Sequence, residues 1–319
     1  MTRLRCAILD DYFNLALSVA NWSDIADRTD VTAFNHPFVS EGATVSALKD
    51  FEIICAMRER TAFPRSLFAA LPKLKLLLTS GMRNAAIDLE AAKDHGVVVC
   101  GTKYSRDPTA ALTMGLILEL TRGIGRENAC MHAGEPWQRF AGIEIEGLTL
   151  GVVGLGKLGS KVAGLAKAFG MKVIAWSPNL TPEKCKEIGV GYASKEELFT
   201  AADIVTIHVV LSQRSRGLVG APDLHRMKPT AYLVNTARGP IVDEAALLEA
   251  LQQNRIAGAA LDVFSLEPLP TDHPFRKLDN LVLTPHLGYA TKDALRDHYG
   301  QMVEAIDAWF KGAPPRRLV

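Results

Sequence analysis

The chain has 319 residues, a length that favours two domains over a single core. Hydrophobic residues make up 48% of it and charged residues 22%, the balance of an ordinary globular protein. The formal net charge is +1 and no basic run is concentrated in one place, which argues against nucleic acids and membrane surfaces as partners. The most apolar segment, near residues 110–120, is too short to cross a bilayer.

The first residues contain no apolar stretch long enough for a secretion signal. The five cysteines lie far apart without a Cys-x-x-Cys pair, so we expect reduced thiols with packing roles. Both features predict a cytoplasmic protein. Histidines at six positions show no metal-ligand spacing, and we expect surface or helix-capping roles for them and no metal site: His36, His95, His132, His225, His273 and His298.

Short apolar runs alternate with helical stretches along most of the chain. The runs are β-branched or leucine-rich on both faces, as strands of a helix-covered parallel sheet must be. The first group of predicted strands comprises residues 6–10, 31–35, 51–57, 74–79 and 97–101. The second group comprises residues 148–153, 172–176, 204–209, 231–235, 257–263 and 281–284.

This order predicts an α/β fold with two doubly wound parallel-sheet domains, the second inserted in the first. A long helix over residues 108–122 leads from the first domain into the second. A last helix over residues 290–310 is expected to return to the first domain, because its apolar residues follow helical spacing. The first domain then comprises residues 1–101 and 287–319, and the inserted domain residues 102–286.

A glycine-rich turn of the form G-x-G-x-x-G follows the first strand of the second group and precedes an amphipathic helix. Gly154 permits the tight turn, Gly156 lets the backbone approach a diphosphate, and Gly159 lets helix and strand pack closely. The helix begins near Lys157 and Leu158, where free N–H groups and the helix dipole favour negative charge. The turn therefore predicts a bound dinucleotide.

Ser177 stands at the end of the second strand, where an Asp or Glu would select NAD through the 2′-hydroxyl of the adenine ribose. No negative charge is left there to repel a 2′-phosphate. Asn179 and Thr181 offer hydrogen bonds and Lys184 offers charge, although no arginine is placed to clamp a phosphate. The cofactor is thus expected to be NAD(P), with NADP favoured and NAD left open.

Polar residues follow the later strands of the second group, where ligands bind in open parallel sheets. Solvated loops explain each residue taken singly but explain the joint pattern poorly. The residues at these strand ends are His208, Thr236, Arg238, Asp262, Glu267, His286 and Gly288.

A guanidinium and an imidazole beside a bound dinucleotide fit the reduction of a 2-oxo acid. This reaction needs a cation for the substrate carboxylate and an acid that protonates the developing alkoxide. Arg238 suits the first role because guanidinium binds carboxylates bidentately and keeps its charge. His286 suits the second, since histidine exchanges protons near neutral pH. Glu267 would stabilise the imidazolium if it is hydrogen-bonded to that ring.

The chain strongly resembles the D-isomer-specific 2-hydroxyacid dehydrogenases, and the match is most specific in residues 151–159, 234–247, 260–270 and 283–288. The resemblance implies that Arg238, Glu267 and His286 are the catalytic trio. It also implies that the loop of residues 80–84, with Met82 and Arg83, helps Arg238 and His286 to bind the substrate carboxylate. Arg83 stands where this family's loop usually has glycine.

For the cofactor, the resemblance adds Thr113 on the long helix and places Asp262 near the nicotinamide carboxamide. Together with the strand-end pattern, the expected cofactor contacts are Thr113, Gly154, Gly156, Lys157, Leu158, Gly159, Ser177, His208, Thr236, Asp262 and Gly288. The family further implies that residues 102–286 form a Rossmann-like dinucleotide-binding (cofactor) domain inserted in a flavodoxin-like substrate domain of residues 1–101 and 287–319. It also implies a homodimer formed through the cofactor domain.

The implied activity is that of an NAD(P)-dependent D-2-hydroxyacid dehydrogenase acting as a ketoacid reductase of the glyoxylate or hydroxypyruvate type. Two alternatives stay open at this point. One is a dinucleotide-sensing binding protein like the corepressors that share this architecture, and the other is a same-fold enzyme with different chemistry. The sequence leaves the identity of the 2-oxo acid open.

Overall fold

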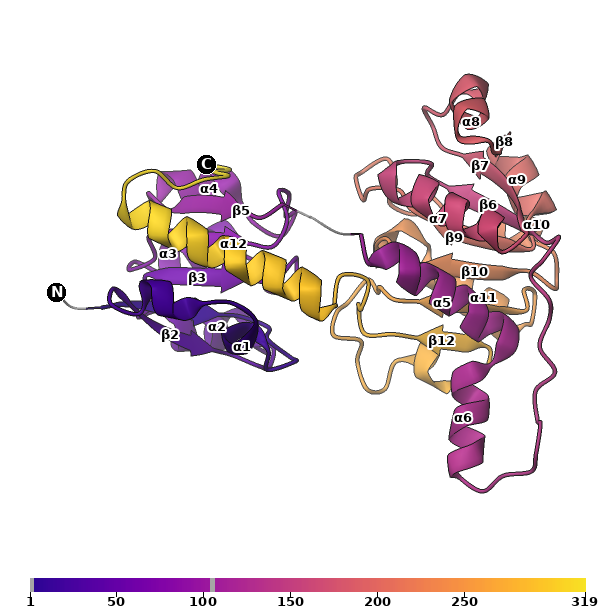
Figure 1. The fold of residues 1–319 in the computed structure, drawn as a ribbon, viewed down its shortest axis with the longest axis horizontal. Coiled ribbons are helices and arrows are strands. Elements are labelled where there is room, and N and C mark those ends of the chain that lie inside the picture. The colour runs from indigo at the N-terminus through magenta and orange to yellow at the C-terminus, as the bar shows by residue number, and fades with distance from the viewer. Residues whose placement is uncertain (1–2, 104–106) are drawn as a thin grey trace. The chain divides into compact units, whose positions relative to one another are not determined.

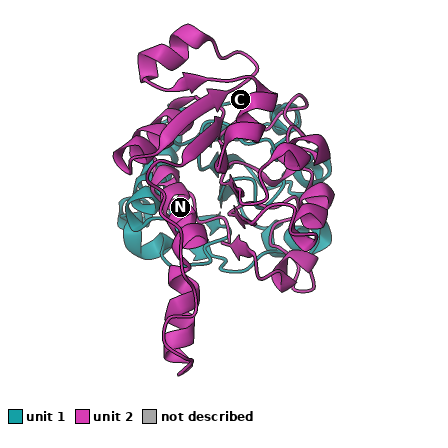
Figure 2. Cartoon of the chain, turned by 90° about the vertical axis from the view of Figure 1, so that its right-hand side faces the viewer, with its two compact units in different colours: residues 1–106, 290–319 teal, residues 107–289 magenta. Residues whose placement is uncertain are grey.

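Two parallel sheets organise the chain in a computed structural model that describes residues 3–103 and 107–319 (Figure 1). The chain divides into unit 1, residues 1–106 and 290–319, and unit 2, residues 107–289 (Figure 2). Within the described ranges, no helix combines the length and the apolarity needed to cross a membrane.

Unit 1 contains a five-stranded sheet in the order β2-β1-β3-β4-β5, with every neighbouring pair parallel. The order reverses between β1 and β3, as in flavodoxin-like sheets. Its strands are β1 (Leu4–Ile8), β2 (Thr29–Ala33), β3 (Ile53–Ala56), β4 (Leu76–Thr79) and β5 (Val98–Gly101). Its helices are α1 (Ala16–Val19), η1 (Trp22–Ile25), α2 (Glu41–Leu48), α3 (Arg65–Ala70), α4 (Leu89–Asp94) and α12 (Lys292–Phe310).

Helix α12 belongs to unit 1 although it comes last in the chain. Figure 1 shows this yellow helix lying along the sheet of unit 1, and it contacts α1 and η1. The rings of Trp22 and Tyr299 lie 6.3 Å apart in this contact. Residues from α2, α3 and α4, including Leu48, Phe68 and Ala91, form a separate buried cluster with the strands. Apolar spacing therefore predicted the return of the last helix correctly.

Unit 2 contains a seven-stranded parallel sheet in the order β12-β11-β10-β9-β6-β7-β8. The order reverses between β6 and β9, the arrangement of a Rossmann fold. Its strands are β6 (Thr149–Val153), β7 (Lys172–Trp176), β8 (Gly191–Tyr192), β9 (Ile204–Ile207), β10 (Tyr232–Asn235), β11 (Gly258–Leu261) and β12 (Leu281–Leu283). The two sheets confirm the predicted fold class.

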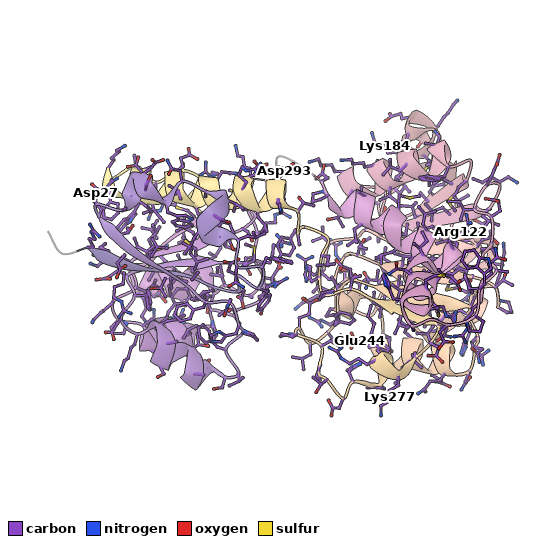
Figure 3. The ribbon with its side chains drawn as sticks, turned by 60° about the horizontal axis from the view of Figure 1, so that its bottom comes forward. Asp27, Arg122, Lys184, Glu244, Lys277 and Asp293 are labelled. Atoms are coloured by element: carbon purple, nitrogen blue, oxygen red, sulfur yellow. The ribbon has the colours of Figure 1, made fainter. Side chains whose placement is uncertain are left out.

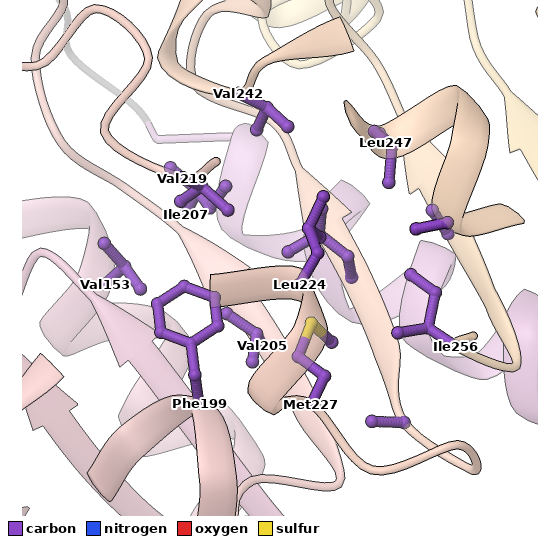
Figure 4. Close-up of a cluster of buried hydrophobic side chains, with 14 of the residues drawn as sticks. Val153, Phe199, Val205, Ile207, Val219, Leu224, Met227, Val242, Leu247 and Ile256 are labelled. Atoms are coloured by element: carbon purple, nitrogen blue, oxygen red, sulfur yellow. The ribbon is translucent and has the colours of Figure 1, made fainter. Parts of the chain in front are cut away.

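The helices of unit 2 cover both faces of this sheet, because successive strand residues point to opposite sides. Val205 and Leu233 face a cluster that includes Phe199 of α9, shown in Figure 4, whereas Ile204 and Val234 face a cluster that includes α5 and α7. The helices are α5 (Thr109–Arg122), α6 (Ile124–His132), α7 (Lys157–Ala168), α8 (Pro182–Ile188), α9 (Lys195–Ala201), α10 (Ala221–Arg226), η2 (Gly239–Ile241), α11 (Glu244–Gln252) and η3 (Pro274–Lys277).

The sheets differ from the sequence prediction in the bounds of several strands and in one additional strand; β2, for example, is Thr29–Ala33 rather than residues 31–35. The first strand is Leu4–Ile8 rather than residues 6–10, and Asp10 has already turned into a left-handed conformation with φ 58°. Strand β8 was not predicted, since two exposed residues are too few to form an alternating pattern.

Candidate active site

The turn after β10 carries Arg238. Asn235, the last residue of β10, ties this turn together: its Nδ2 donates to the carbonyl of Arg238 at 3.0 Å, and its Oδ1 accepts from the N–H of Ala237 at 3.0 Å. The Arg238 guanidinium donates through Nη1 to the carbonyl of Ala237 at 2.7 Å. This arrangement fixes the backbone from which the guanidinium extends.

Gly239 brings that turn against the loop that follows β11. A Cβ atom at Gly239 would lie 2.1 Å from the carbonyl carbon of Phe264 and 2.4 Å from the nitrogen of Ser265, so only glycine permits this approach. In the same loop the N–H of Phe264 donates to Oε1 of Glu267 at 2.9 Å. The backbone beside Arg238 therefore touches the backbone that orients Glu267.

The imidazole of His286 lies against the carboxylate of Glu267, with Nδ1 and Oε2 2.5 Å apart. Both side chains are largely buried, with exposed fractions of 13% for His286 and 24% for Glu267. Because Nδ1 is engaged by the carboxylate, Nε2 is the ring nitrogen that can donate a proton to a ligand. The structure thus joins two of the three predicted catalytic residues by a hydrogen bond and connects the third through Gly239.

Asp262 holds the turn that presents His286. Its carboxylate accepts from the hydroxyl of Thr284 at 2.6 Å and from the N–H groups of Leu287 at 2.6 Å and Gly288 at 2.8 Å. Burial raises the pKa of Asp262, and these three hydrogen bonds oppose the rise. His286 itself has φ 52°, a left-handed conformation that the Asp262 hydrogen bonds help to maintain.

The glycine turn has the geometry that a dinucleotide requires. Gly154 has φ 101°, and a Cβ there would lie 2.7 Å from Val209. A Cβ at Gly159 would lie 2.0 Å from the carbonyl oxygen of Gly154, so this glycine permits the close packing of α7 on β6. By contrast, a Cβ at Gly156 would meet no described atom within 4 Å. The open space beside Gly156, at the start of α7, fits a diphosphate.

The two residues that begin α7 differ in their surroundings. Lys157 is exposed and pairs with Asp107, its Nζ lying 3.0 Å from Oδ2, whereas Leu158 is partly buried against the core that α7 shares with α5. Exposed ion pairs of this kind contribute little to stability. The ammonium of Lys157 therefore remains accessible to an anion.

The residues expected near the adenine ribose have mixed roles. Ser177 is partly buried, and its carbonyl accepts from the N–H of Leu180 at 3.0 Å. Thr181 caps α8 by accepting from the N–H of Lys184 at 3.3 Å. The Lys184 ammonium, labelled in Figure 3, pairs with Glu187 at 2.7 Å. Two of the suggested ribose contacts, Thr181 and Lys184, therefore already have local partners.

His208 presents an enclosed nitrogen at the edge of the glycine turn. Its Nε2 lies 2.9 Å from Oγ1 of Thr206, whereas its Nδ1 is buried and has no hydrogen-bond partner among the residues that the structure describes. Burial lowers the pKa of His208 to about 4, so the ring is neutral at physiological pH. A buried polar atom without a partner costs free energy, which makes Nδ1 a fitting ligand contact.

The hydroxyl of Thr113 on α5 meets that of Thr236 after β10. Their Oγ1 atoms lie 2.9 Å apart, and Thr113 also donates to the carbonyl of Thr109 at 2.9 Å. Thr109 in turn donates to the carbonyl of Gly288 at 2.8 Å. Predicted cofactor residues from α5, β10 and the turn after β12 are thus brought together in unit 2.

In unit 1, Met82 and Arg83 lie in the loop after β4, and both are exposed. The N–H groups of Ser80 and Gly81 are already used, by the carbonyl of Ala56 at 3.2 Å and by Oγ1 of Thr102 at 2.9 Å. Neither amide is therefore available for a substrate. The prediction that this loop binds the substrate carboxylate then applies to the N–H groups that follow Gly81. The N–H groups of Met82 and Arg83 have no acceptor within residues 3–103 and 107–319.

Sequence reasoning missed His298 and Thr102. A surface or capping role for His298 was wrong: this side chain is buried in α12, and its Nδ1 lies 2.6 Å from Oγ1 of Thr102. A signal was present, because His298 lies three residues after Leu295 and four before Met302 on the apolar face of the helix. No cluster of His, Cys, Asp and Glu that could hold a metal occurs in the described part of the chain.

Comparison with known proteins identifies the family. Residues 114–288 match the model of the D-isomer specific 2-hydroxyacid dehydrogenase, NAD binding domain. The chain belongs to the D-isomer specific 2-hydroxyacid dehydrogenase family. This finding confirms the resemblance inferred from the glycine turn and the strand-end residues.

Relatives within this dehydrogenase family differ in length. D-3-phosphoglycerate dehydrogenase of Bacillus subtilis is 40% identical over 261 residues, which cover 81% of this chain and 49% of that protein. The chain thus spans about half the length of the curated D-3-phosphoglycerate dehydrogenases that it matches. Glyoxylate reductase of Aeropyrum pernix is 38% identical over 79% of this chain and 78% of its own length. The solved structure of phosphoglycerate oxidoreductase from Vibrio cholerae O395 is 34% identical, with a TM-score of 0.93 over 97% of this chain and 100% of that one.

Proposed function

We propose that this dehydrogenase-family member is an NAD(P)-dependent oxidoreductase that reduces a short 2-oxo acid to the D-2-hydroxy acid. The observation that supports this most strongly is the Glu267–His286 hydrogen bond, held beside the Arg238 turn at the carboxyl edge of the unit 2 sheet. The same sheet carries the glycine turn, whose open side fits a dinucleotide.

Each residue of the trio has a distinct task in this reaction. Arg238 binds the substrate carboxylate and polarises the adjacent carbonyl. When bound, the nicotinamide supplies a hydride to the carbonyl carbon, and the electron pair of the C=O bond moves to oxygen. His286 gives the Nε2 proton to that oxygen and becomes neutral. Glu267 stabilises the imidazolium before the transfer and keeps the ring in one orientation.

Unit 1 would add two backbone groups to substrate binding. The N–H groups of Met82 and Arg83 are among the loop amides still available for a carboxylate, and adjacent N–H groups of this kind form anion sites. Arg83 adds a positive charge where the family usually has glycine, so we expect it to favour substrates with a further polar or anionic group.

We propose that residues of unit 2 hold the cofactor. These are Thr113, Gly154, Gly156, Lys157, Leu158, Gly159, Ser177, His208, Thr236, Asp262 and Gly288. Ser177 supports NADP over NAD because it leaves no carboxylate near a 2′-phosphate. Titration with NADPH and NADH measures the preference, and Ser177→Asp should shift it toward NADH.

We also infer a homodimer formed through unit 2. Helix α6 has no buried residue, and Ile124, Met131 and Trp137 on this helix and the segment that follows are strongly exposed. Figure 1 shows α6 extending away from the rest of unit 2. Exposed apolar side chains of this number favour association with a second copy. Sedimentation should show a dimer, and Trp137→Glu should weaken it.

The cytoplasm is the proposed location of this enzyme. All five cysteines are free thiols, and four of them are buried in the two units. Reduced thiols in a chain of this size are typical of reducing compartments.

A direct test is the consumption of NADPH or NADH with glyoxylate, hydroxypyruvate, pyruvate and phenylpyruvate. We expect turnover of at least one of these acids and formation of the D-hydroxy acid. A folded protein that binds dinucleotide yet reduces none of them would contradict the proposed function. Product analysis by chiral chromatography checks the stereochemistry.

A further inference from the structure

A buried hydrogen-bond relay in unit 1 connects helix α12 to the loop after β4. His298 of α12 and Thr102, which directly follows β5, are both buried, with exposed fractions of 1% and 0%. His298 Nδ1 lies 2.6 Å from Oγ1 of Thr102, and the same oxygen accepts from the N–H of Gly81 at 2.9 Å. The relay thus ends on the backbone that immediately precedes Met82 and Arg83.

The proton positions in this relay follow from the available partners. Oγ1 of Thr102 accepts from Gly81, and among the described residues its own hydrogen has no acceptor other than Nδ1 of His298. Within these contacts we assign the hydroxyl as the donor and Nδ1 of a neutral imidazole as the acceptor. Burial lowers the pKa of His298 to about 4, the charge of Arg58 lowers it further, and Asp297 opposes this. The neutral ring is consequently the form present at physiological pH.

The backbone of the loop after β4 lies so close to the end of β5 that a small displacement of either would bring their atoms into steric conflict. A Cβ at Gly101 would be 2.6 Å from the carbonyl oxygen of Gly81 and 3.1 Å from Cα of Met82. Gly81 itself has φ 96°, so its orientation depends on surrounding contacts rather than on its own preference. On the other side of the loop, Nδ2 of Asn84 donates to the carbonyl of Arg58 at 2.6 Å.

We propose that His298 is a positioning residue for substrate binding, acting through Thr102 to hold the Gly81 peptide so that the N–H groups of Met82 and Arg83 point together at an anion. This inference rests on the proposed function and adds residues that act behind the loop. A purely apolar side chain would fill the same buried position on α12 without supplying an acceptor. The imidazole differs from such a side chain because it accepts the hydrogen of the Thr102 hydroxyl and so fixes the orientation of that group.

The test compares variants that keep or remove each hydrogen-bonding group. His298→Leu removes the acceptor, whereas His298→Asn places an amide oxygen near the position of Nδ1. Thr102→Val removes the hydroxyl at nearly constant shape, and Thr102→Ser keeps it. We expect the Leu and Val variants to raise the KM for the 2-oxo acid roughly tenfold, as for loss of about one buried hydrogen bond. Their kcat and cofactor Kd should change less than about twofold, and Asn and Ser should restore KM.

A readout without substrate separates this inference from the proposed function. Hydrogen exchange of the Gly81 amide should become roughly tenfold faster in His298→Leu and Thr102→Val, for the same loss of a hydrogen bond. Thr29→Val is the matched control, because Thr29 is also a buried threonine of unit 1, donating to the carbonyl of Ile25 at 2.8 Å. If the wild type reduces no 2-oxo acid, the exchange result alone decides whether the relay holds the loop.

Two results would overturn the proposal. One is unchanged Gly81 exchange in both His298→Leu and Thr102→Val. The other is a rise in KM no larger than in Thr29→Val, with a comparable loss of stability. If His298→Leu does not fold, Gly81 exchange and KM are compared between Thr102→Val and Thr29→Val alone.

Discussion

Glu267 uses its two carboxylate oxygens on different partners: Oε2 lies 2.5 Å from Nδ1 of His286, and Oε1 accepts from the N–H of Phe264 at 2.9 Å. The second contact prevents the carboxylate from rotating away from the imidazole. The loop after β11 therefore determines the orientation of a ring that belongs to the turn after β12.

Glu267→Gln should lower kcat for 2-oxo acid reduction by roughly 10²-fold, because a neutral amide stabilises the imidazolium poorly and positioned acid–base help is worth about 10²–10⁴. The cofactor Kd should stay within about twofold. Glu244→Gln is a matched control. Glu244 lies on α11, and its carboxylate accepts at 2.7 Å from the N–H of Ser265, a residue of the loop that contains Glu267. Wild-type turnover in Glu267→Gln would refute the role assigned to this carboxylate.

Arg238→Lys should raise the KM for the 2-oxo acid roughly 10- to 100-fold, because an ammonium cannot reproduce the two parallel hydrogen bonds of guanidinium. Steady-state kinetics with the best acid of the panel measures the effect. Arg226→Lys on α10 is the control, as its guanidinium donates to the carbonyl of Pro222 at 2.9 Å. Equal KM values in the two variants would speak against Arg238 as the carboxylate ligand.

Substitutions in the glycine turn should separate cofactor binding from folding. Gly156→Ala should leave the free energy of unfolding nearly unchanged, since φ is −81° and the space is open, but should weaken cofactor binding about tenfold or more by blocking the diphosphate. Gly159→Ala should cost about 2–3 kcal/mol of stability because its Cβ would overlap Gly154.

Gly164→Ala is the control for these two variants. It lies within α7 with no described atom within 4 Å of its Cβ position, so it should stabilise the protein by about 0.5–1 kcal/mol and leave the cofactor Kd unchanged. Urea unfolding and fluorescence titration of NADPH measure the two quantities. Tight binding by Gly156→Ala would contradict the proposed place of the diphosphate.

The buried His298 and the partly buried His208 predict a loss of stability in acid. The pKa values of His208 and His298 are lowered from 6.5 to about 4 by burial, so the unfolded chain takes up these protons before the folded chain does. The contribution of these neutral rings to the free energy of unfolding is therefore fully present above pH 6.5. It falls as the pH drops toward 4, by up to about 3 kcal/mol per histidine. Denaturant midpoints measured across this range test the prediction.

The non-titrating variants His298→Asn and His208→Gln should each flatten that dependence for the unit in which they lie. His225→Asn, at an exposed position of α10, serves as the control. An unchanged acid dependence in both His298→Asn and His208→Gln would show that other groups cause the loss.

The sequence alone determined the fold class, because each strand and helix has a local apolar period that reports which faces are buried. It also located the glycine turn and the residues at the strand ends, since parallel strands bring their carboxyl ends to one edge. The family model over residues 114–288 confirms the assignment that these motifs predicted.

Only the tertiary structure decided how those residues contact one another. The approach of Gly239 to Phe264, the second hydrogen bond of Glu267 and the contact of Thr102 with His298 involve loop geometry or distant parts of the chain. Local periodicity carries no information on such contacts, because burial alone does not tell which side chain a polar atom faces. For His298, helical spacing marks a buried position, but its partner, 196 residues away, is set by how α12 packs in unit 1.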